Sequence, residues 1–217
     1  ASDPKGEVIF FEASKRRALD IYRNSIVHYL AIPSILARSV RGGASPKQLS
    51  EDVQVWRELL YREFFTPEAQ AATASTDAML DHFEASGWIE RERDAVRVTE
   101  AGEGILSCLD YQTRGVVECY EAVCRVVFDS GGEIGKEALL ERGLELLTNA
   151  HRLGLSSHPE AANQATLANA LDLLVGREIL VSVGAPASDS KVKYAPGDAW
   201  ESLGERHELL ARLALSR

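Results

Sequence analysis

Apolar residues recur every three or four positions through most of this chain, the spacing that places them on one face of an α-helix. The pattern predicts helices over residues 46–64, 77–85, 105–128, 136–153, 166–176 and 200–213. The longest, residues 105–128, keeps a 3.6-residue period and is followed by a glycine pair that should end it. The chain is therefore expected to be mainly α.

Two short stretches change to a strand pattern and predict β-hairpins. Residues 88–98 carry a tight turn at Arg93-Asp94, and residues 177–195 enclose a loop of Gly, Pro, Ser and Asp. Because each hairpin directly follows a helix, we expect a helical body with two winged-helix-like units. The expected division is a lead-in over residues 1–18 and helical units over residues 19–130 and 131–217.

Residues 19–37 combine an apolar face with polar side chains beside it. Tyr22, Ile26, Tyr29 and Leu30 share one face at helical spacing. Pro33 lacks an amide hydrogen, so it is expected to kink or end the helix near residue 32, with a short turn to residue 41. The segment is interpreted either as a core helix or as an interface. The candidate interface or ligand-contacting residues are Tyr22, Arg23, Asn24 and His28.

The charge is unevenly spread along the chain. The net charge is −9, yet residues 1–65 hold 10 Lys and Arg against 8 Asp and Glu. An acidic body fits nucleic acid poorly, so no nucleic-acid binding is expected. The basic residues near the start are expected to face phosphate or an anionic membrane surface, or else only solvent. They are the candidate basic surface Lys15, Arg16 and Arg17, followed by Arg23, Arg38 and Arg41.

Neither the cysteines nor the histidines form a metal site in the sequence. Cys108, Cys119 and Cys124 lie in one predicted helix, which is neither a disulfide framework nor zinc spacing. We interpret them as small core residues in a reducing compartment. No metal and no cofactor are expected. No apolar run approaches the roughly 20 residues that span a bilayer, and no signal peptide is expected. The expected location is cytoplasmic, peripheral to the inner membrane.

No catalytic motif stands out in the sequence. There is no glycine-rich phosphate loop and no Gly-x-Ser-x-Gly turn. No histidine is followed five residues later by aspartate, and His158 is interpreted as part of a turn before a helix.

Several stretches together resemble one known family. Tyr22, Arg23, Asn24, His28 and Pro33 follow its pattern, although Ser25 stands where the pattern has a second Asn. WRELLYREFF (residues 56–65), VVECYEAVCRVV (116–127) and HPEAANQATLANALDLLVGREIL (158–180) follow in the family's order. They resemble the segment after the catalytic domain in membrane-associated glycerol-3-phosphate 1-O-acyltransferases, the PlsB type and its mitochondrial relatives.

This resemblance implies a non-catalytic C-terminal domain of an enzyme of phospholipid biosynthesis. The family's acyltransferase box is histidine, four residues and aspartate, in which the histidine acts as base and the aspartate orients it. The box is absent from this sequence, so the chain alone is expected to be inactive. An upstream domain would move an acyl group from acyl-CoA or acyl carrier protein to the sn-1 hydroxyl. The implied partners are that catalytic domain, the membrane surface and a second copy. The alternative is a tandem winged-helix-like regulatory or scaffold module that binds protein.

Overall fold

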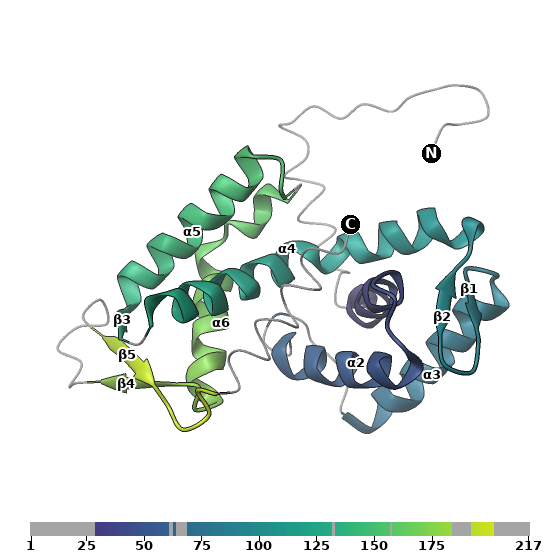
Figure 1. Cartoon of the computed structure of the whole chain (residues 1–217), viewed down its shortest axis with the longest axis horizontal. Coiled ribbons are helices and arrows are strands. Elements are labelled where there is room, and N and C mark those ends of the chain that lie inside the picture. The colour runs from purple at the N-terminus through teal and green to yellow at the C-terminus, as the bar shows by residue number, and fades with distance from the viewer. Residues whose placement is uncertain are drawn as a thin grey trace.

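Helices dominate the computed structural model, which describes residues 29–60, 63, 69–131, 133–156, 158–183 and 192–201. Residues 29–41 are helical and are followed by α2 (Pro46–Leu60), α3 (Ala69–Ala85), α4 (Glu100–Ser130), α5 (Lys136–Arg152) and α6 (Gln164–Gly176). A short 3₁₀ helix, η1 (Pro159–Ala161), precedes α6. The expectation of a mainly α fold with small hairpins is confirmed (Figure 1).

Two small antiparallel sheets accompany the helices. The first pairs β1 (Ile89–Arg91) with β2 (Val96–Val98). The second contains β3 (Ile134–Gly135), β4 (Leu180–Val183) and β5 (Lys193–Pro196) in the order β3-β5-β4. Both predicted hairpins are present, and β3 is a strand that the sequence pattern did not predict. The winged-helix comparison stays a prediction.

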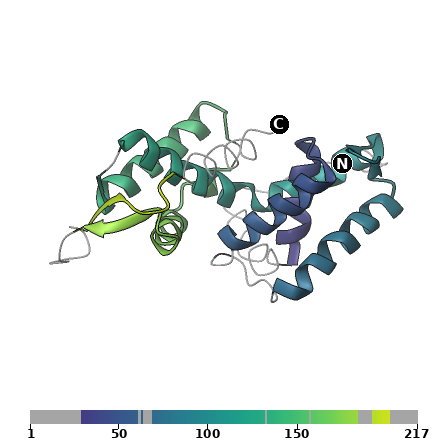
Figure 2. The ribbon, with the colours of Figure 1, turned by 60° about the horizontal axis from the view of Figure 1, so that its bottom comes forward.

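Helix α4 is the axis on which the other elements are arranged. The helix at residues 29–41, α2, α3 and the first hairpin gather around one half of α4, and α5, α6 and the second sheet around the other (Figures 1 and 2). The buried apolar residues of the described chain form one cluster, which extends from Ala31 to Tyr194. The division of the chain at residue 130 stays a prediction.

The helix boundaries follow local sequence signals. The Ser45 hydroxyl accepts a hydrogen bond from the Gln48 amide at 3.3 Å, and the Thr99 hydroxyl accepts one from the Gly102 amide at 3.0 Å. Each hydroxyl satisfies an amide that has no partner inside the helix. Gly131 ends α4 in the left-handed conformation, with φ of 66°. The predicted start of α2 at residue 46 and the predicted glycine end of α4 are confirmed, whereas α4 begins at Glu100, before residue 105 where the long helix was expected to start.

The helix at residues 29–41 differs from its prediction in two respects. It runs through Pro33 without ending there, since residues 32–34 are all helical. Packing accounts for this, because Ile35, Leu36 and Ala37 directly after the proline are at most 2 % exposed. Tyr29, expected on the inward face, is 75 % exposed.

Other expectations meet mixed outcomes. Cys119 and Cys124 are buried as expected, but Cys108 lies on the exposed side of α4, and none of the three forms a disulfide. The last predicted helix covers residues 200–213. In the structure residues 198–201 form a turn, and residues 202–213 lie outside the described residues.

Candidate functional site

The residues predicted to form an interface all lie outside the described part of the chain. They are Tyr22, Arg23, Asn24 and His28, with the basic residues Lys15, Arg16 and Arg17. Their roles therefore stay predictions. The structure instead shows what holds the helix at residues 29–41 that follows them.

Two arginines of the basic stretch form ion pairs inside the protein. Arg38 Nε lies 2.6 Å from Asp110 Oδ1, and Arg41 Nη1 lies 2.9 Å from Asp110 Oδ2. Arg41 Nη2 also lies 3.1 Å from Glu103 Oε1. A buried carboxylate is costly unless it is paired, and these two cations provide the pairing for Asp110. The basic residues near the start were expected to face phosphate, a membrane or solvent. This expectation is wrong for Arg38 and Arg41.

The Arg38 guanidinium is one of the most deeply buried charged groups of the described chain. The residue is 1 % exposed, and burial lowers the pKa of Arg38 while the Asp110 carboxylate opposes that shift. Its Nη1 and Nη2 atoms are buried and have no hydrogen-bond partner among the described residues. Loss of Asp110 would thus leave an uncompensated buried charge, so the pair fixes where residues 29–41 lie against α4.

A second polar cluster lies further along α4. The Ser156 hydroxyl donates to Glu118 Oε2 at 2.6 Å, and His158 Nδ1 lies 3.4 Å from Glu118 Oε1. The His158 ring is packed on Tyr111, with 4.2 Å between the ring centroids. This cluster attaches the segment between α5 and α6 to α4.

Arg114 connects the two clusters. Its Nη1 lies 3.8 Å from Asp110 Oδ2 and its Nε 3.5 Å from Glu118 Oε1. Asp110, Arg114 and Glu118 are four residues apart, so they lie on one side of α4. We call these three residues the α4 polar stripe. It contacts the helix at residues 29–41 on one half of the molecule and Ser156 and His158 on the other.

The chemistry of the α4 polar stripe is that of a structural network. Its carboxylates are paired with cations, and the Ser156 hydroxyl donates to Glu118 instead of to His158. A nucleophile would need its own base within hydrogen-bond reach. Among the described residues, no group of three His, Cys, Asp or Glu side chains is placed to hold a metal ion.

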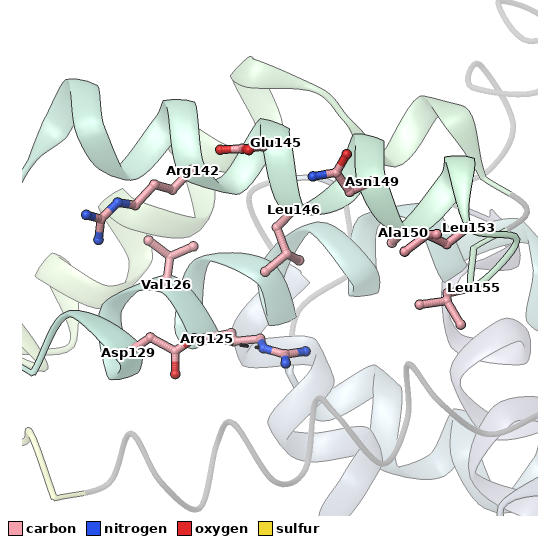
Figure 3. Close-up of a pocket in the computed structure, with 10 residues that line it drawn as sticks. All are labelled: Arg125, Val126, Asp129, Arg142, Glu145, Leu146, Asn149, Ala150, Leu153 and Leu155. Carbon is pink, nitrogen blue, oxygen red and sulfur yellow. Dashed lines mark ion pairs between the residues drawn. The ribbon is translucent and has the colours of Figure 1, made fainter.

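An open groove between α4 and α5 is a candidate binding surface (Figure 3). Its volume is about 460 Å³, and Leu153 and Leu155 at its rim are 74 % and 67 % exposed. Asp129 and Arg142 lie at the opposite end, and the Arg125 side chain extends toward the middle below Leu146 (Figure 3). The remaining lining residues are Val126, Glu145, Leu146, Asn149 and Ala150. We call this surface the α4–α5 groove.

Sequence reasoning missed both the α4 polar stripe and this groove. The spacing of Asp110, Arg114 and Glu118 is visible in the sequence as a helical charge pattern. Their partners Arg38 and His158 come from distant segments, and no local pattern predicts such a pairing.

The fold and these contacts define the class of protein as a helical domain with a buried polar network and an open groove. The sequence of this domain contains no acyltransferase box. In the described part, no helix has the length and apolar character needed to cross a bilayer. The chain matches the glycerol-3-phosphate acyltransferase C-terminal region over residues 1–183 and belongs to that family. A C-terminal region of this kind implies an upstream domain in the same enzyme. The match includes the predicted interface and the α4 polar stripe.

Proposed function

We propose that this domain is the non-catalytic support of the upstream catalytic domain. That domain would transfer an acyl group from acyl-CoA or acyl carrier protein to the sn-1 hydroxyl of glycerol 3-phosphate. One observation carries the proposal. The helix at residues 29–41, which directly follows the predicted interface Tyr22 to His28, is fixed to α4 through the buried Arg38–Asp110 ion pair.

Further contacts hold the same helix in place. Ser34 Oγ lies 2.6 Å from Thr113 Oγ1 and donates to the Asp110 carbonyl at 3.3 Å. At the described start of the helix, Tyr29 is 75 % exposed, and it is the next residue in the sequence after the proposed interface. A firmly held helix with such an end is suited to positioning the segment before it, because positioning requires a rigid support.

The proposed interface joins the two domains through residues 15–28. Tyr22, Arg23, Asn24 and His28 would contact the catalytic domain, with Lys15, Arg16 and Arg17 toward that domain or an anionic membrane surface. The proposed location that goes with this interface is the cytoplasm, peripheral to the inner membrane. In a homodimer, a second copy of the chain would instead bind to the proposed interface at residues 15–28.

The experiment compares the full-length acyltransferase that contains this region with the 217-residue chain. The double substitution Arg23→Ala and Asn24→Ala is expected to reduce full-length activity or membrane association by about tenfold or more, because misplaced catalytic groups react slowly. The matched control is Arg93→Ala at the exposed turn of the first hairpin, which should change neither. The thermal melting of the 217-residue chain should be the same in all variants.

Two results would contradict the proposal. If the double substitution unfolds the 217-residue chain and full-length activity falls only in proportion, residues 23 and 24 are structural. The purified chain should also show no turnover of acyl-CoA with glycerol 3-phosphate. Turnover that a point mutation in this chain abolishes would overturn the non-catalytic role.

A further inference from the structure

The first hairpin has a strand edge that is unpaired in the described part of the chain. β1 and β2 form a sheet of two strands, so each strand has an edge that faces away from the other. β2 is the strand on the side of the helix at residues 29–41 (Figure 1). A free strand edge presents amide and carbonyl groups to which another strand can bind.

The register of the hairpin shows which backbone groups lie on the free edge of β2. The Glu92 amide donates to the Ala95 carbonyl. In an antiparallel pair every second residue bonds to the partner strand, so Arg97, two positions after Ala95, bonds to β1. Val96 and Val98 therefore direct their amide and carbonyl groups to the opposite edge.

The two outer edges of the hairpin differ in what they bind. On β1, the Arg91 amide donates to Glu84 Oε1 at 3.4 Å. On β2, the amides and carbonyls of Val96 and Val98 have no hydrogen-bond partner among the described residues. Val96 is only 5 % exposed, so little of this residue is open to water. Because a buried backbone group without a partner is costly, this edge is suited to binding another strand.

An open pocket of about 360 Å³ lies along the free edge. It is lined by β2, by the end of the helix at residues 29–41 with the turn after it, and by the first turn of α4. The lining residues are Val40, Arg41, Gly43, Val96, Arg97, Val98 and Glu103. A Cβ atom at Gly43 would meet no group of the described chain within 4 Å, apart from its chain neighbours. The pocket thus leaves room for a backbone beside β2, since glycine permits close approach.

We propose that a strand of the upstream catalytic domain pairs with the edge formed by Val96 and Val98. The proposal rests on the proposed function, because it gives the supported domain a second contact besides residues 15–28. The catalytic domain belongs to the same polypeptide, which raises its effective concentration at this edge above that of a separate protein. Addition of a strand to a free sheet edge is an established mode of recognition, in which main-chain hydrogen bonds supply the affinity.

The charge of Arg97 specifies which strand fits. Its side chain is 66 % exposed and lies 3.4 Å from the Glu92 carboxylate. Opposite charges on directly opposed residues of neighbouring strands stabilise a sheet, so the docked strand should carry a carboxylate opposite Arg97. A second copy of β2 paired over its full length would instead place Arg97 opposite Arg97, and like charges in that position are destabilising. The edge therefore favours a different strand over a homodimer.

Amide hydrogen exchange tests the proposal. Exchange at Val96 and Val98 is measured by mass spectrometry with electron-transfer fragmentation, in the 217-residue chain and in the full-length acyltransferase. Exchange at these two amides should be slower by about tenfold or more in the full-length enzyme, because strand pairing protects them. The exposed turn at Arg93 and Asp94 is the internal control and should exchange at the same rate in both proteins.

Charge reversal tests which strand binds. In the full-length enzyme, Arg97→Glu should bring exchange at Val96 and Val98 to within about threefold of the rate in the 217-residue chain, because it repels the opposed carboxylate. The matched control Arg93→Glu, at the exposed turn of the same hairpin, should leave the protection intact. Circular dichroism checks that each variant is folded, and Arg97→Gln replaces Arg97→Glu if the latter unfolds.

Each other outcome overturns the proposal. Equal exchange at Val96 and Val98 in the two proteins would show that no strand binds this edge in the enzyme. Protection that rises with the concentration of the 217-residue chain would identify a second copy as the occupant. Protection that survives Arg97→Glu would exclude a strand selected by its carboxylate. The proposed function is tested separately, by the activity of the double variant at residues 23 and 24, so the two failures are distinguishable.

Discussion

At the scale of single residues, Glu63 is a carboxylate held in an unfavourable environment. Its Oε1 accepts hydrogen bonds from Asn169 Nδ2 at 2.9 Å and from the Tyr120 hydroxyl at 3.3 Å. Burial raises the pKa of Glu63, and these two hydrogen bonds only partly oppose that shift. Glu63 thus connects the segment after α2 to α4 and α6 at the cost of holding a charge in a partly buried place.

The raised pKa of Glu63 predicts a specific pH dependence of stability. The folded state binds the proton more tightly than the unfolded chain, so the free energy of unfolding falls as pH rises from the ordinary pKa of 4.5 through the raised value. Glu63→Gln keeps an oxygen acceptor and removes the charge. The variant should be at least as stable as the parent at pH 7 and lack this fall, measured by urea unfolding from pH 4 to 8.

The matched control for Glu63→Gln is Glu90→Gln on the exposed face of β1. It should leave the slope of stability against pH above 4.5 unchanged. The interpretation is wrong if Glu63→Gln destabilises the protein at pH 7 while the slope of the parent is retained. In that case the hydrogen bonds to the charged form outweigh its desolvation.

At the scale of elements, the first hairpin is packed directly on the first turn of α4. The Thr99 amide donates to the Trp88 carbonyl at 3.0 Å, and the Thr99 hydroxyl donates to the Gly87 carbonyl at 2.5 Å. A Cβ atom at Gly102 would lie 2.0 Å from the Trp88 carbonyl oxygen. Only glycine permits this approach of the two backbones.

Gly102 and Gly104 provide a matched pair of substitutions in one helix. Gly102→Ala forces the hairpin away from α4 and should destabilise the protein by about 1–3 kcal/mol. A Cβ atom at Gly104 would meet no group of the described chain outside its own helix backbone within 4 Å. Gly104→Ala should therefore stabilise the protein by about 0.5–1 kcal/mol through helix propensity. Chemical denaturation measures both. Equal effects of the two substitutions would show that the contact with Trp88 does not determine the packing.

At the scale of the whole molecule, α4 and its polar stripe connect both halves. Asp110 pairs with Arg38 and Arg41 in one half, and Glu118 binds Ser156 in the other. The buried apolar residues also form one cluster. A shared core and a shared polar network favour unfolding in a single cooperative step.

Arg38→Met tests this cooperativity. It removes one cation from buried Asp110 and should destabilise the protein by about 3–5 kcal/mol, as broken buried ion pairs do. Circular dichroism and tryptophan fluorescence should report the same lowered transition. Two separated transitions would instead support independent units divided near residue 130.

The control for Arg38→Met is Arg91→Met. Arg91 pairs with Asp81 and Glu84 at 2.5 Å, but these side chains are 32 %, 65 % and 40 % exposed. Solvent screens such pairs, so this substitution should have a much smaller effect than Arg38→Met. Similar losses from both substitutions would contradict the special role of the buried pair.

Local signals in the sequence determined the helices, their caps and both hairpins. Ser45 and Thr99 begin helices and Gly131 ends one, because caps and turns depend on residues only a few positions apart. The ordered motifs from Tyr22 to Leu180 likewise sufficed for the family, which the match over residues 1–183 confirms.

Tertiary structure decided what depends on distant segments. Arg38 is followed 72 residues later by its partner Asp110, and β3 joins β5 across α5 and α6. Gly102 and Gly104 are alike in the sequence AGEG, and only the position of Trp88 distinguishes them. The helix also continues through Pro33 because burial of the residues after it outweighs the local preference of proline. Pairing and burial of this kind depend on the whole packed chain, which local spacing does not encode.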